Sequence, residues 1–335
     1  MKFFVLQIVA LALPLLLSCR SSAQISLVSP GTGSKVTTPV WVRAHVSACG
    51  GLTPTALGYS IDNSPTMTWS TSPFDIDKLD FSIPTSSTHV IHFKAWAGSK
   101  MCPLVDSTVA VVGPQMAANT VAYKNLESSS GWQYNHDPGT PGASTGSMSM
   151  TASPSISGLA GLFYMTFSDY GGEIYHLNFA NNPNYTHFVY DTYIYVADPQ
   201  NAQNIEMDMN QVTPNGHTVI LGTQCASGSG TWEFTTYLKG SSHWNPSNIR
   251  CNPTKWSPNS WHHVQIATHR DSSGDAFYDS VTFDDVISYF TKAYGYSGFA
   301  LGWPVGVLLL NYQLDGNSPK GSVLSYLNKL TIYSW

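Results

Sequence analysis

Residues 204–212 read NIEMDMNQV, in which polar and apolar side chains alternate with a period of two. This period is typical of a β-strand with one buried face, because successive side chains of a strand point to opposite sides of the sheet. The three apolar side chains are expected to pack in a core. Glu206, Asp208 and Asn210 are expected to share the opposite, polar face.

Segments of the same kind fill the rest of the chain, separated by Gly, Pro, Asn and Ser. No long amphipathic helix is visible between them. Regular short strands with turn residues in between predict an all-β protein built from sandwiches. After residue 120 the strand-like segments include GLFYMTFS (161–168), THFVYDTYIYVA (186–197), HTVILGTQC (217–225), TWEFTTYL (231–238) and LNKLTIYSW (327–335).

The first part of the mature chain carries shorter strands. SLVSPGTGSKVTTPVWVRA (26–44) followed by HVIHFKAWAGSKMC (89–102) resembles a bacterial immunoglobulin-like module. The resemblance implies an immunoglobulin-like β-sandwich over residues 25–112, and His89 and His92 are expected to be ordinary strand residues in it. VVGPQMAANT (111–120) has a Gly-Pro break and no periodicity, so residues 113–120 are expected to be a linker.

The second part, residues 121–335, resembles the concanavalin A-like lectin and glucanase jelly rolls. The resemblance rests on WHHVQI (261–266), YDSVTFDDVISYF (278–290) and the closing SYLNKLTIYSW (325–335). In such domains a Trp-His pair opens a late strand, and the last strand returns beside the first. The implied fold is a jelly roll of two curved antiparallel sheets. Because lectins, glucanases, lyases and non-catalytic modules share this fold, it does not define the reaction.

The N-terminus predicts export. A lysine and an apolar run of about fifteen residues, too short for a membrane span, read as a signal peptide over residues 1–24. Two processing routes stay open. SSA before Gln24 suits an ordinary signal peptidase, whereas LLSC is similar to a bacterial lipobox in which Cys19 would become a lipid anchor. Both routes predict a secreted or cell-surface protein.

The amino-acid composition indicates which class of ligand the protein can bind. Only 10% of the 335 residues are charged, the net charge is −5, and 13% are aromatic. Nucleic acid is excluded as a partner, because its phosphates require clustered Lys and Arg. Abundant Ser, Thr, Asn, Gly and aromatic residues favour a neutral, hydroxyl-rich ligand such as a polysaccharide, bound by a monomer.

The cysteines predict disulfides. Apart from Cys19, four cysteines remain, and an oxidising compartment makes their pairing expected. Of the three possible connectivities we favour Cys49–Cys102 with Cys225–Cys251, because it keeps each bridge within its own domain.

The acidic strand predicts a glycan site. Residues two apart on one strand face lie roughly 6.6 Å apart, so Glu206 and Asp208 repel and the pKa of one should rise. EMDMNQ is similar to the E-x-D-x-x-E signature of jelly-roll glycoside hydrolases. That resemblance implies Glu206 as nucleophile or base and Asp208 as its helper.

The third position of the signature differs. A β-bulge would bring Gln211 to the acid/base position, and a regular strand would bring Asn210 there, but neither amide can donate a catalytic proton. Gln211 is assigned to orienting substrate. The chain is therefore either a non-catalytic carbohydrate-binding or adhesion protein or a glycoside hydrolase with its acid elsewhere. A lyase is disfavoured, because Arg250 and Arg270 alone give little support for an acidic substrate.

Other residues are candidates for binding or for the missing acid. Glu173, Asp191 and Glu233 are the other acids considered, with His176, His217, His262 and His263 as proton carriers. In LNYQLDGN, Gln313 and Asp315 would extend the polar face if their strand lies beside residues 204–212. The predicted substrate-binding residues are Trp132, Tyr175, Tyr190, Asn210, His263, Gln313 and Asp315.

No cofactor is predicted. The chain lacks HExxH, CxxC and Walker-type motifs. GASTG (142–146) has the letters of the G-x-S-x-G motif, but the α/β alternation that a serine nucleophile elbow requires is missing. RDSSGDAFYD (270–279) groups Asp271, Asp275 and Asp279, which leaves a structural calcium ion as an alternative to a hydrophilic hairpin, although the spacing is not that of an EF-hand.

Overall fold

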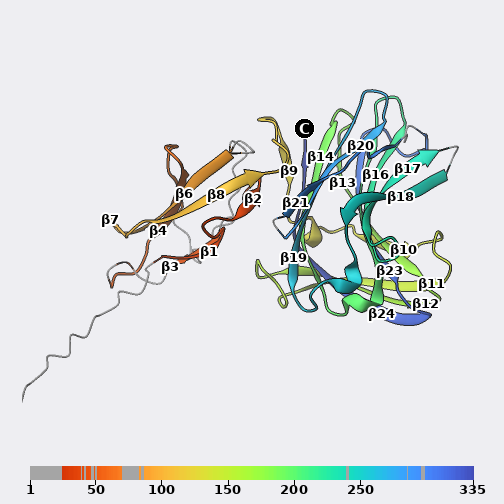
Figure 1. The fold of residues 1–335 in the computed structure, drawn as a ribbon, viewed down its shortest axis with the longest axis horizontal. Helices are drawn as coiled ribbons and strands as arrows, with labels where there is room; N and C mark the ends of the chain where they lie inside the picture. The colour runs from red at the N-terminus through yellow and green to blue at the C-terminus, as the bar shows by residue number, and fades with distance from the viewer. Residues whose placement is uncertain are drawn as a thin grey trace, which may run out of the picture.

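The computed structural model describes residues 25–335 except positions 39, 41–42, 47–48, 50, 70–82, 84–86, 239–240, 285 and 296–298. The described chain forms two β-rich units that follow one another along the long axis of the molecule (Figure 1). Their strands belong to separate sheets and their buried side chains form separate cores. The predicted signal peptide and Cys19 lie outside the described residues.

The N-terminal unit is a small sandwich with two sheets. One sheet pairs β1 with β3, and the other has the order β2-β8-β6-β4-β5 with β7 added to β6. Its core includes Ile25, Leu57, Ile91, Phe93 and Val111, all nearly inaccessible to solvent. The strands are β1 (Ile25–Ser29), β2 (Lys35–Thr37), β3 (Arg43–Val46), β4 (Ala56–Ile61), β5 (Met67–Trp69), β6 (Ser87–Ala97), β7 (Lys100–Met101) and β8 (Val105–Val112).

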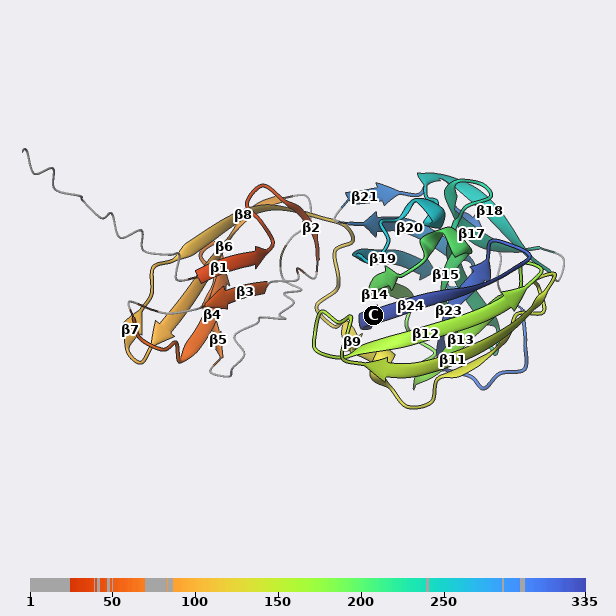
Figure 2. The ribbon, with the colours of Figure 1, turned by 90° about the horizontal axis from the view of Figure 1, so that it is seen from below.

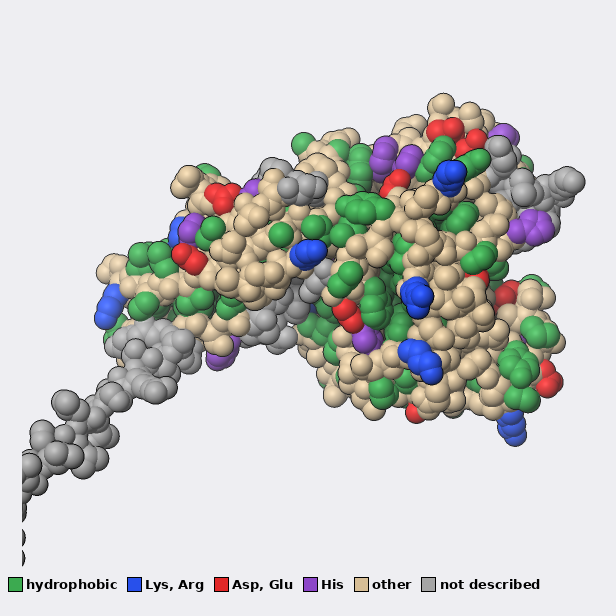
Figure 3. Space-filling view, in the orientation of Figure 1, with side chains coloured by type: hydrophobic (Ala, Val, Ile, Leu, Met, Phe, Trp, Pro, Cys, Tyr) green, Lys and Arg blue, Asp and Glu red, His purple; other side chains and the backbone are tan. Residues whose placement is uncertain are grey.

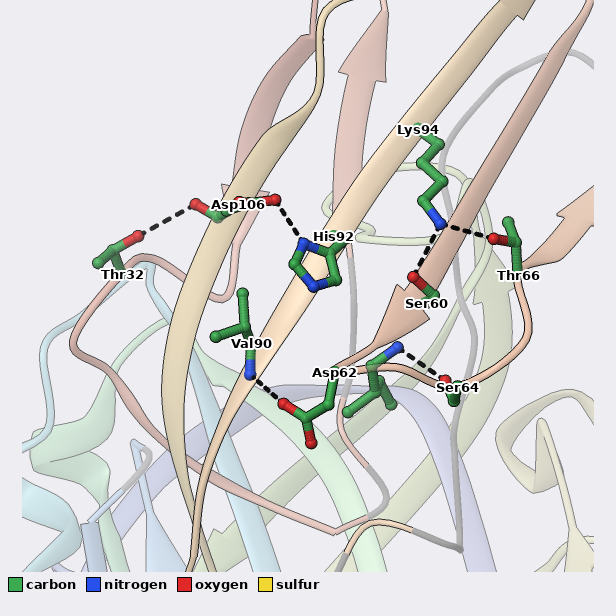
Figure 4. Close-up of polar contacts among 10 residues, drawn as sticks. Thr32, Ser60, Asp62, Ser64, Thr66, Val90, His92, Lys94 and Asp106 are labelled. Carbon is green, nitrogen blue, oxygen red and sulfur yellow. Dashed lines mark hydrogen bonds and ion pairs between the residues drawn. The ribbon is translucent and has the colours of Figure 1, made fainter.

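Strand β6 makes polar contacts with neighbouring segments of this unit, and Figure 4 shows those of His92 and Lys94. His92 Nδ1 lies 2.7 Å from Asp106 Oδ1, and His89 Nδ1 lies 2.7 Å from Asp62 Oδ2. Lys94 on the same strand donates to the hydroxyls of Ser60 and Thr66. These pairs hold neighbouring segments of the small sandwich together.

The C-terminal unit is a jelly-roll β-sandwich of two antiparallel sheets. The first sheet has the order β10-β13-β23-β15-β16-β17-β18, and the second has the order β11-β12-β24-β14-β19-β20-β21, with β9 and β22 added to it. The first sheet contains β10 (Gln133–His136), β13 (Gly172–Asn181), β15 (Ala202–Val212), β16 (Thr218–Ala226), β17 (Thr231–Leu238), β18 (Ser241–Arg250) and β23 (Val307–Gly316).

The second sheet closes the sandwich around the core. It contains β9 (Val121–Tyr123), β11 (Ala143–Thr151), β12 (Ala160–Ser168), β14 (His187–Val196), β19 (Trp261–Arg270), β20 (Ala276–Phe283), β21 (Val286–Tyr289), β22 (Tyr294–Gly295) and β24 (Lys320–Ser334). Between the sheets, Phe163 lies edge-on to Tyr175 and Tyr312, with ring centroids 5.1 and 5.3 Å apart. Figure 2 shows the strands of the two sheets stacked as layers.

The segment that joins the units packs on the outer face of the second sheet. Met116 is 3% exposed and lies against Val189, Ala267 and Tyr333. Five residues after Met116, β9 begins and pairs with the end of β24. Burial of an apolar side chain of this size is worth about 2 kcal/mol, so the segment is fixed to the C-terminal sandwich at this point.

The all-β, jelly-roll expectation is confirmed, and both predicted disulfides, Cys49–Cys102 and Cys225–Cys251, are present. The helical segments of the described chain are three-residue 3-10 turns at Leu126–Ser128, Pro199–Asn201 and Pro253–Lys255. No helix in the described chain is both long and apolar enough to cross a membrane. The immunoglobulin-like assignment of the first unit stays a prediction.

Candidate functional site

The acidic strand β15 lies in the middle of the first sheet, between β23 and β16. Its pairing with both neighbours is regular from Asn204 to Gln211, without a bulge. Ile205, Met207 and Met209 face the core, as the alternation predicts. Glu206 and Asp208 therefore point to the outer face of the sheet, where Glu206 lies opposite Gln313 of β23 and Gln224 of β16.

This outer face holds a pocket of about 590 Å³, named the acidic pocket below. Three strands, β15, β16 and β23, and the loop that carries Asp137 supply its carboxyl groups and amides. Tyr170, from the loop between β12 and β13, and Trp244, from the edge strand β18, supply aromatic rings. Its lining includes Asp137, Tyr170, Asn204, Glu206, Asp208, Gln224, Trp244, Asn311, Gln313 and Asp315.

Amide side chains orient the carboxylates. Asn311 donates to Asp208 Oδ2 at 3.1 Å. Asp315 accepts from Asn204 at 2.9 Å and from Gln313 at 3.0 Å, and Gln313 also donates to Asp137 Oδ2 at 3.0 Å. Two strand glycines, Gly222 and Gly172, leave room for these carboxylates. A methyl group at Gly222 would lie 2.8 Å from Asp208 Oδ1, and one at Gly172 would collide with Asp315 Oδ1.

Burial raises the pKa values of these carboxyl groups. Desolvation and the nearby charges of Asp208, Asp315 and Asp137 raise the pKa of Glu206 well above its ordinary value of 4.5. Desolvation raises the pKa of Asp208 to about 6, opposed by hydrogen bonds from Glu206 and Asn311. Desolvation also raises the pKa of Asp315 to about 6. The acidic pocket thus holds three carboxyl groups whose pKa values burial raises above their ordinary values.

The charge of the acidic pocket is of one sign. Among the described lining residues there is no Lys, Arg or His. Within the described parts of the chain, no group of three or more His, Cys, Asp and Glu is arranged to hold a metal ion. The arrangement is suited to proton transfer and to accepting hydrogen bonds from a polar ligand.

Four predicted site residues, including Asp208, line the acidic pocket, whereas two others from β15 do not. Glu206, Gln313 and Asp315 line it, because β23 lies beside β15 as the sequence argument required. Asn210 follows Asp208 on the same face of β15, but its side chain is only 2% exposed and does not line the acidic pocket. Gln211 points to the other face, which corrects the expectation that it orients substrate.

Gln211 has a structural environment instead. Its amide donates to the carbonyls of Asn182 and Tyr185, and its oxygen accepts from Arg270 Nε. Without a bulge after Asp208, residue 211 cannot reach the face that carries Glu206. The network ties β15 to β19 of the opposite sheet through Arg270.

Replacing Gln211 by Ala is expected to lower stability and leave the acidic pocket intact. The change removes the hydrogen bonds that the Gln211 side chain makes with the buried guanidinium of Arg270 and with two backbone carbonyls. Leaving these groups without a partner should lower the free energy of unfolding by about 2–3 kcal/mol. Chemical unfolding measures this loss, and glycan affinity at 20 °C should stay within about twofold of wild type, a ratio under 0.5 kcal/mol. Gln133→Ala, at an exposed glutamine of β10, serves as the matched control. A tenfold loss of affinity in Gln211→Ala alone would contradict this placement.

Four further predicted binding residues lie away from the acidic pocket. Tyr175 is fully buried in the core, where its hydroxyl donates to the Tyr164 carbonyl, and Tyr190 is also a core residue. Trp132 packs edge-on against Phe163 and donates to the Leu126 carbonyl. His263 lies on β19 of the second sheet, 2.8 Å from Asp191. The structure corrects the prediction that these four residues bind substrate in the acidic pocket. Three of the side chains pack in or against the core, and the fourth lies on the second sheet.

The other acids considered are also separated by the fold. Glu173 faces inward and accepts from Ser144, and Asp191 belongs to the second sheet. Glu233 lies on the pocket face two strands from Glu206, and it accepts a hydrogen bond from Gln224. Two strands correspond to roughly 9.6 Å, so Glu233 is the one of the three on the correct face.

The histidines give no proton carrier in the acidic pocket. His262 lies 2.7 Å from Asp284, and His217 contacts Asn215 in the hairpin before β16. His176 is on the pocket face, bonded to Gln133, and burial lowers its pKa. It lies two strands from Asp208 along the sheet and outside the lining.

The aspartates of RDSSGDAFYD stabilise a hairpin. Asp271 Oδ1 accepts from the backbone amides of Ser273 and Asp275. Asp279 Oδ2 lies 2.9 Å from His269 Nδ1. The carboxylates of Asp271 and Asp279 therefore have different partners.

Sequence reasoning missed most of the lining residues, and four of them show why. Asp137 and Tyr170 come from loops, Trp244 from an edge strand, and Gln224 from β16. Gln224 follows HTVILGT with the alternation of a strand, so pairing of consecutive strands could have predicted it opposite Glu206. The loop residues had no periodic signal.

Comparison with known proteins gives a weak likeness in fold. No protein-family model matches the chain, and no curated protein matches its sequence. A solved structure described as a study of promiscuous carbohydrate-binding modules of the β-sandwich superfamily is 10% identical, with a TM-score of 0.36, and covers 91% of this chain and 96% of its own.

Two further solved structures align with about two thirds of the chain. A Bacillus licheniformis β-glucanase is 11% identical, with a TM-score of 0.35 and coverage of 64% of this chain and 97% of its own. Lectin II from Ulex europaeus is 8% identical, with a TM-score of 0.29 and coverage of 65% and 97%. At such identities and scores these likenesses carry no argument about activity, which must come from the acidic pocket.

Proposed function

We propose that the protein is a secreted or cell-surface polysaccharide-binding protein whose ligand occupies the acidic pocket. One observation carries the proposal: carboxyl and amide groups converge on a single concavity that two aromatic side chains also line. Sugar hydroxyls exchange hydrogen bonds with such groups, and the apolar faces of sugar rings pack on aromatic rings.

Export and monomeric state belong to the same proposal. The two disulfides support an oxidising compartment, and the sequence of residues 1–24 supports a signal peptide. Lipid attachment at Cys19 and release by ordinary signal peptidase stay open as alternatives. The N-terminal sandwich would then hold the pocket-bearing sandwich away from the cell surface.

Hydrolysis of the bound polysaccharide is the second candidate, and the raised pKa of Glu206 favours it. A glycosidase needs one carboxylic acid with a raised pKa and a second, ionised carboxylate. Glu206 has the environment of the acid, and Asp208 or Asp315 that of the ionised partner. Glu206 would protonate the leaving oxygen while the carboxylate attacks the anomeric carbon or deprotonates the attacking water. This assignment reverses the role that the E-x-D resemblance implies for Glu206.

The test combines retention and product release on a panel of insoluble and soluble polysaccharides. Wild type is expected to be retained by at least one glycan, and Asp208→Asn to bind it at least tenfold more weakly, or about 1.4 kcal/mol. Asp169→Asn, at an exposed turn residue beside the pocket, is the control and should bind normally. Retention by no glycan on the panel would contradict the proposal.

Product release separates the two candidates. If oligosaccharides appear, Glu206→Gln should reduce their rate by about 10²–10⁴-fold, the usual contribution of a general acid, while binding persists. If the glycan is retained without products, the protein is a binder, and hydrolysis is excluded for that glycan.

A further inference from the structure

The charge of the acidic pocket restricts the sugar that it can hold. Its lining contains four carboxyl groups, those of Asp137, Glu206, Asp208 and Asp315. A fifth, Glu233, lies on the same face of the sheet next to Gln224. No cationic side chain among the described lining residues balances them. Buried like charges without a counterion are unfavourable, and a bound cation relieves them.

The three amide donors closest to these carboxylates are already engaged with them. Asn204 and Gln313 donate to Asp315, and Asn311 donates to Asp208. What the pocket offers to a ligand is therefore mainly acceptor oxygen. An anionic sugar would meet repulsion, and a sugar bearing many donors is favoured.

One buried oxygen points to the missing donor independently of the charge count. Asp208 is 5% exposed, and no amide or hydroxyl donor among the described residues reaches its Oδ1. A buried acceptor without a partner costs free energy that a ligand can recover by donating to it. The adjacent Gly222 has no side chain, and a methyl group there would lie 2.8 Å from this oxygen. The space beside Oδ1 thus exists because residue 222 is glycine.

We propose, building on the proposed polysaccharide-binding function, that the acidic pocket selects amino sugars with a free, protonated amine over neutral and anionic sugars. An ammonium group has three donors and no acceptor. It complements Asp208 Oδ1 together with the neighbouring carboxyl of Glu206 or Asp315. Charge-assisted hydrogen bonds of this kind are roughly twice as strong as neutral ones.

Three oligosaccharides of equal length test the proposal by titration calorimetry at pH 6.5: a glucosamine hexamer with free amines, its N-acetylated counterpart, and an oligogalacturonide. We expect the free-amine oligomer to bind at least tenfold more tightly than the acetylated one and the oligogalacturonide to give no detectable binding. Raising the salt concentration from 20 to 300 mM should weaken the free-amine complex several-fold and hardly affect the acetylated one.

Two variants and a control locate the selectivity. Asp208→Asn and Asp315→Asn should each reduce the preference for the free amine to about threefold or less. Asp169→Asn removes the same charge from a neighbouring exposed turn and should keep the full preference, which distinguishes the pocket from general surface attraction. Circular dichroism of each variant confirms that it is folded.

The outcomes separate this inference from the function on which it rests. Equal affinity for the free-amine and acetylated oligomers, or tighter binding of the oligogalacturonide, would overturn the amine selectivity and leave polysaccharide binding standing. A preference that survives both pocket variants would also overturn it. Binding of none of the three, together with no retention on the polysaccharide panel, would overturn the proposed function itself.

Discussion

Raising the pH from 5 to 7.5 is expected to lower the free energy of unfolding by about 3–5 kcal/mol. Three buried carboxyl groups account for the loss. The pKa values of Asp208 and Asp315 are raised from 3.8 to about 6, and that of Glu127 from 4.5 to about 7, in each case chiefly by desolvation. Glu127 is 2% exposed and accepts from the backbone amides of Lys329 and Leu330.

The direction follows from proton linkage. A carboxyl whose pKa is higher in the folded chain binds more protons there than in the unfolded chain, so its contribution is full below the unfolded value. That contribution is lost as the pH rises from about 4 through the folded pKa of about 6 or 7. The hydrogen bond with His89 lowers the pKa of Asp62, so the stability that this pair contributes is lost as the pH falls through that lowered pKa. Maximum stability is therefore expected near pH 5.

Chemical unfolding of wild type and Asp315→Asn at intervals from pH 4 to pH 8 measures the effect. The asparagine cannot ionise, so the variant should lose about 1–2 kcal/mol less than wild type between pH 5 and 7.5. Asp169→Asn, whose carboxyl is exposed, should follow wild type throughout. Parallel pH curves for wild type and Asp315→Asn would show that residue 315 is ionised at no cost, contrary to its burial.

The sequence predicted much of the strand pattern and little of the pocket. Period-two alternation identified β15 and its polar face, because a half-buried strand must place every second side chain in the core. It also led to Gln313 and Asp315, since β23 has the same alternation. Pairing of β15 with β23 joins residues about a hundred positions apart, and that step needed the fold.

The wrong predictions have a common cause. Tyr175, Tyr190 and Trp132 are aromatic residues near polar neighbours in sequence, but each ring lies against the core. Aromatic side chains serve packing more often than binding, and sequence neighbours do not show which face of a strand is buried. Gln211 depended on a bulge, which a sequence cannot reveal. Tyr170 and Trp244 were missed because loops and edge strands carry no periodic signal.

Replacing Gly222 by Ala is expected to weaken glycan binding at least tenfold while leaving every charge in place. The new methyl group would lie 2.8 Å from Asp208 Oδ1 and 2.8 Å from the Thr235 methyl, so one of these side chains must move. Overpacking of this kind costs about 1–3 kcal/mol of stability. It would also fill the space through which a ligand reaches Asp208.

Gly228→Ala is the matched control, because a methyl group at this turn position would meet no atom within 4 Å. It should bind glycan and unfold as wild type does. Titration of the best glycan against both variants, with chemical unfolding alongside, separates a blocked pocket from a damaged fold. If Gly222→Ala is folded and binds normally, the ligand does not approach Asp208, and the site must be sought elsewhere on the sheet. If affinity falls and the pH dependence of stability becomes weaker, the methyl group has displaced the Asp208 carboxylate from the buried position in which its pKa is raised.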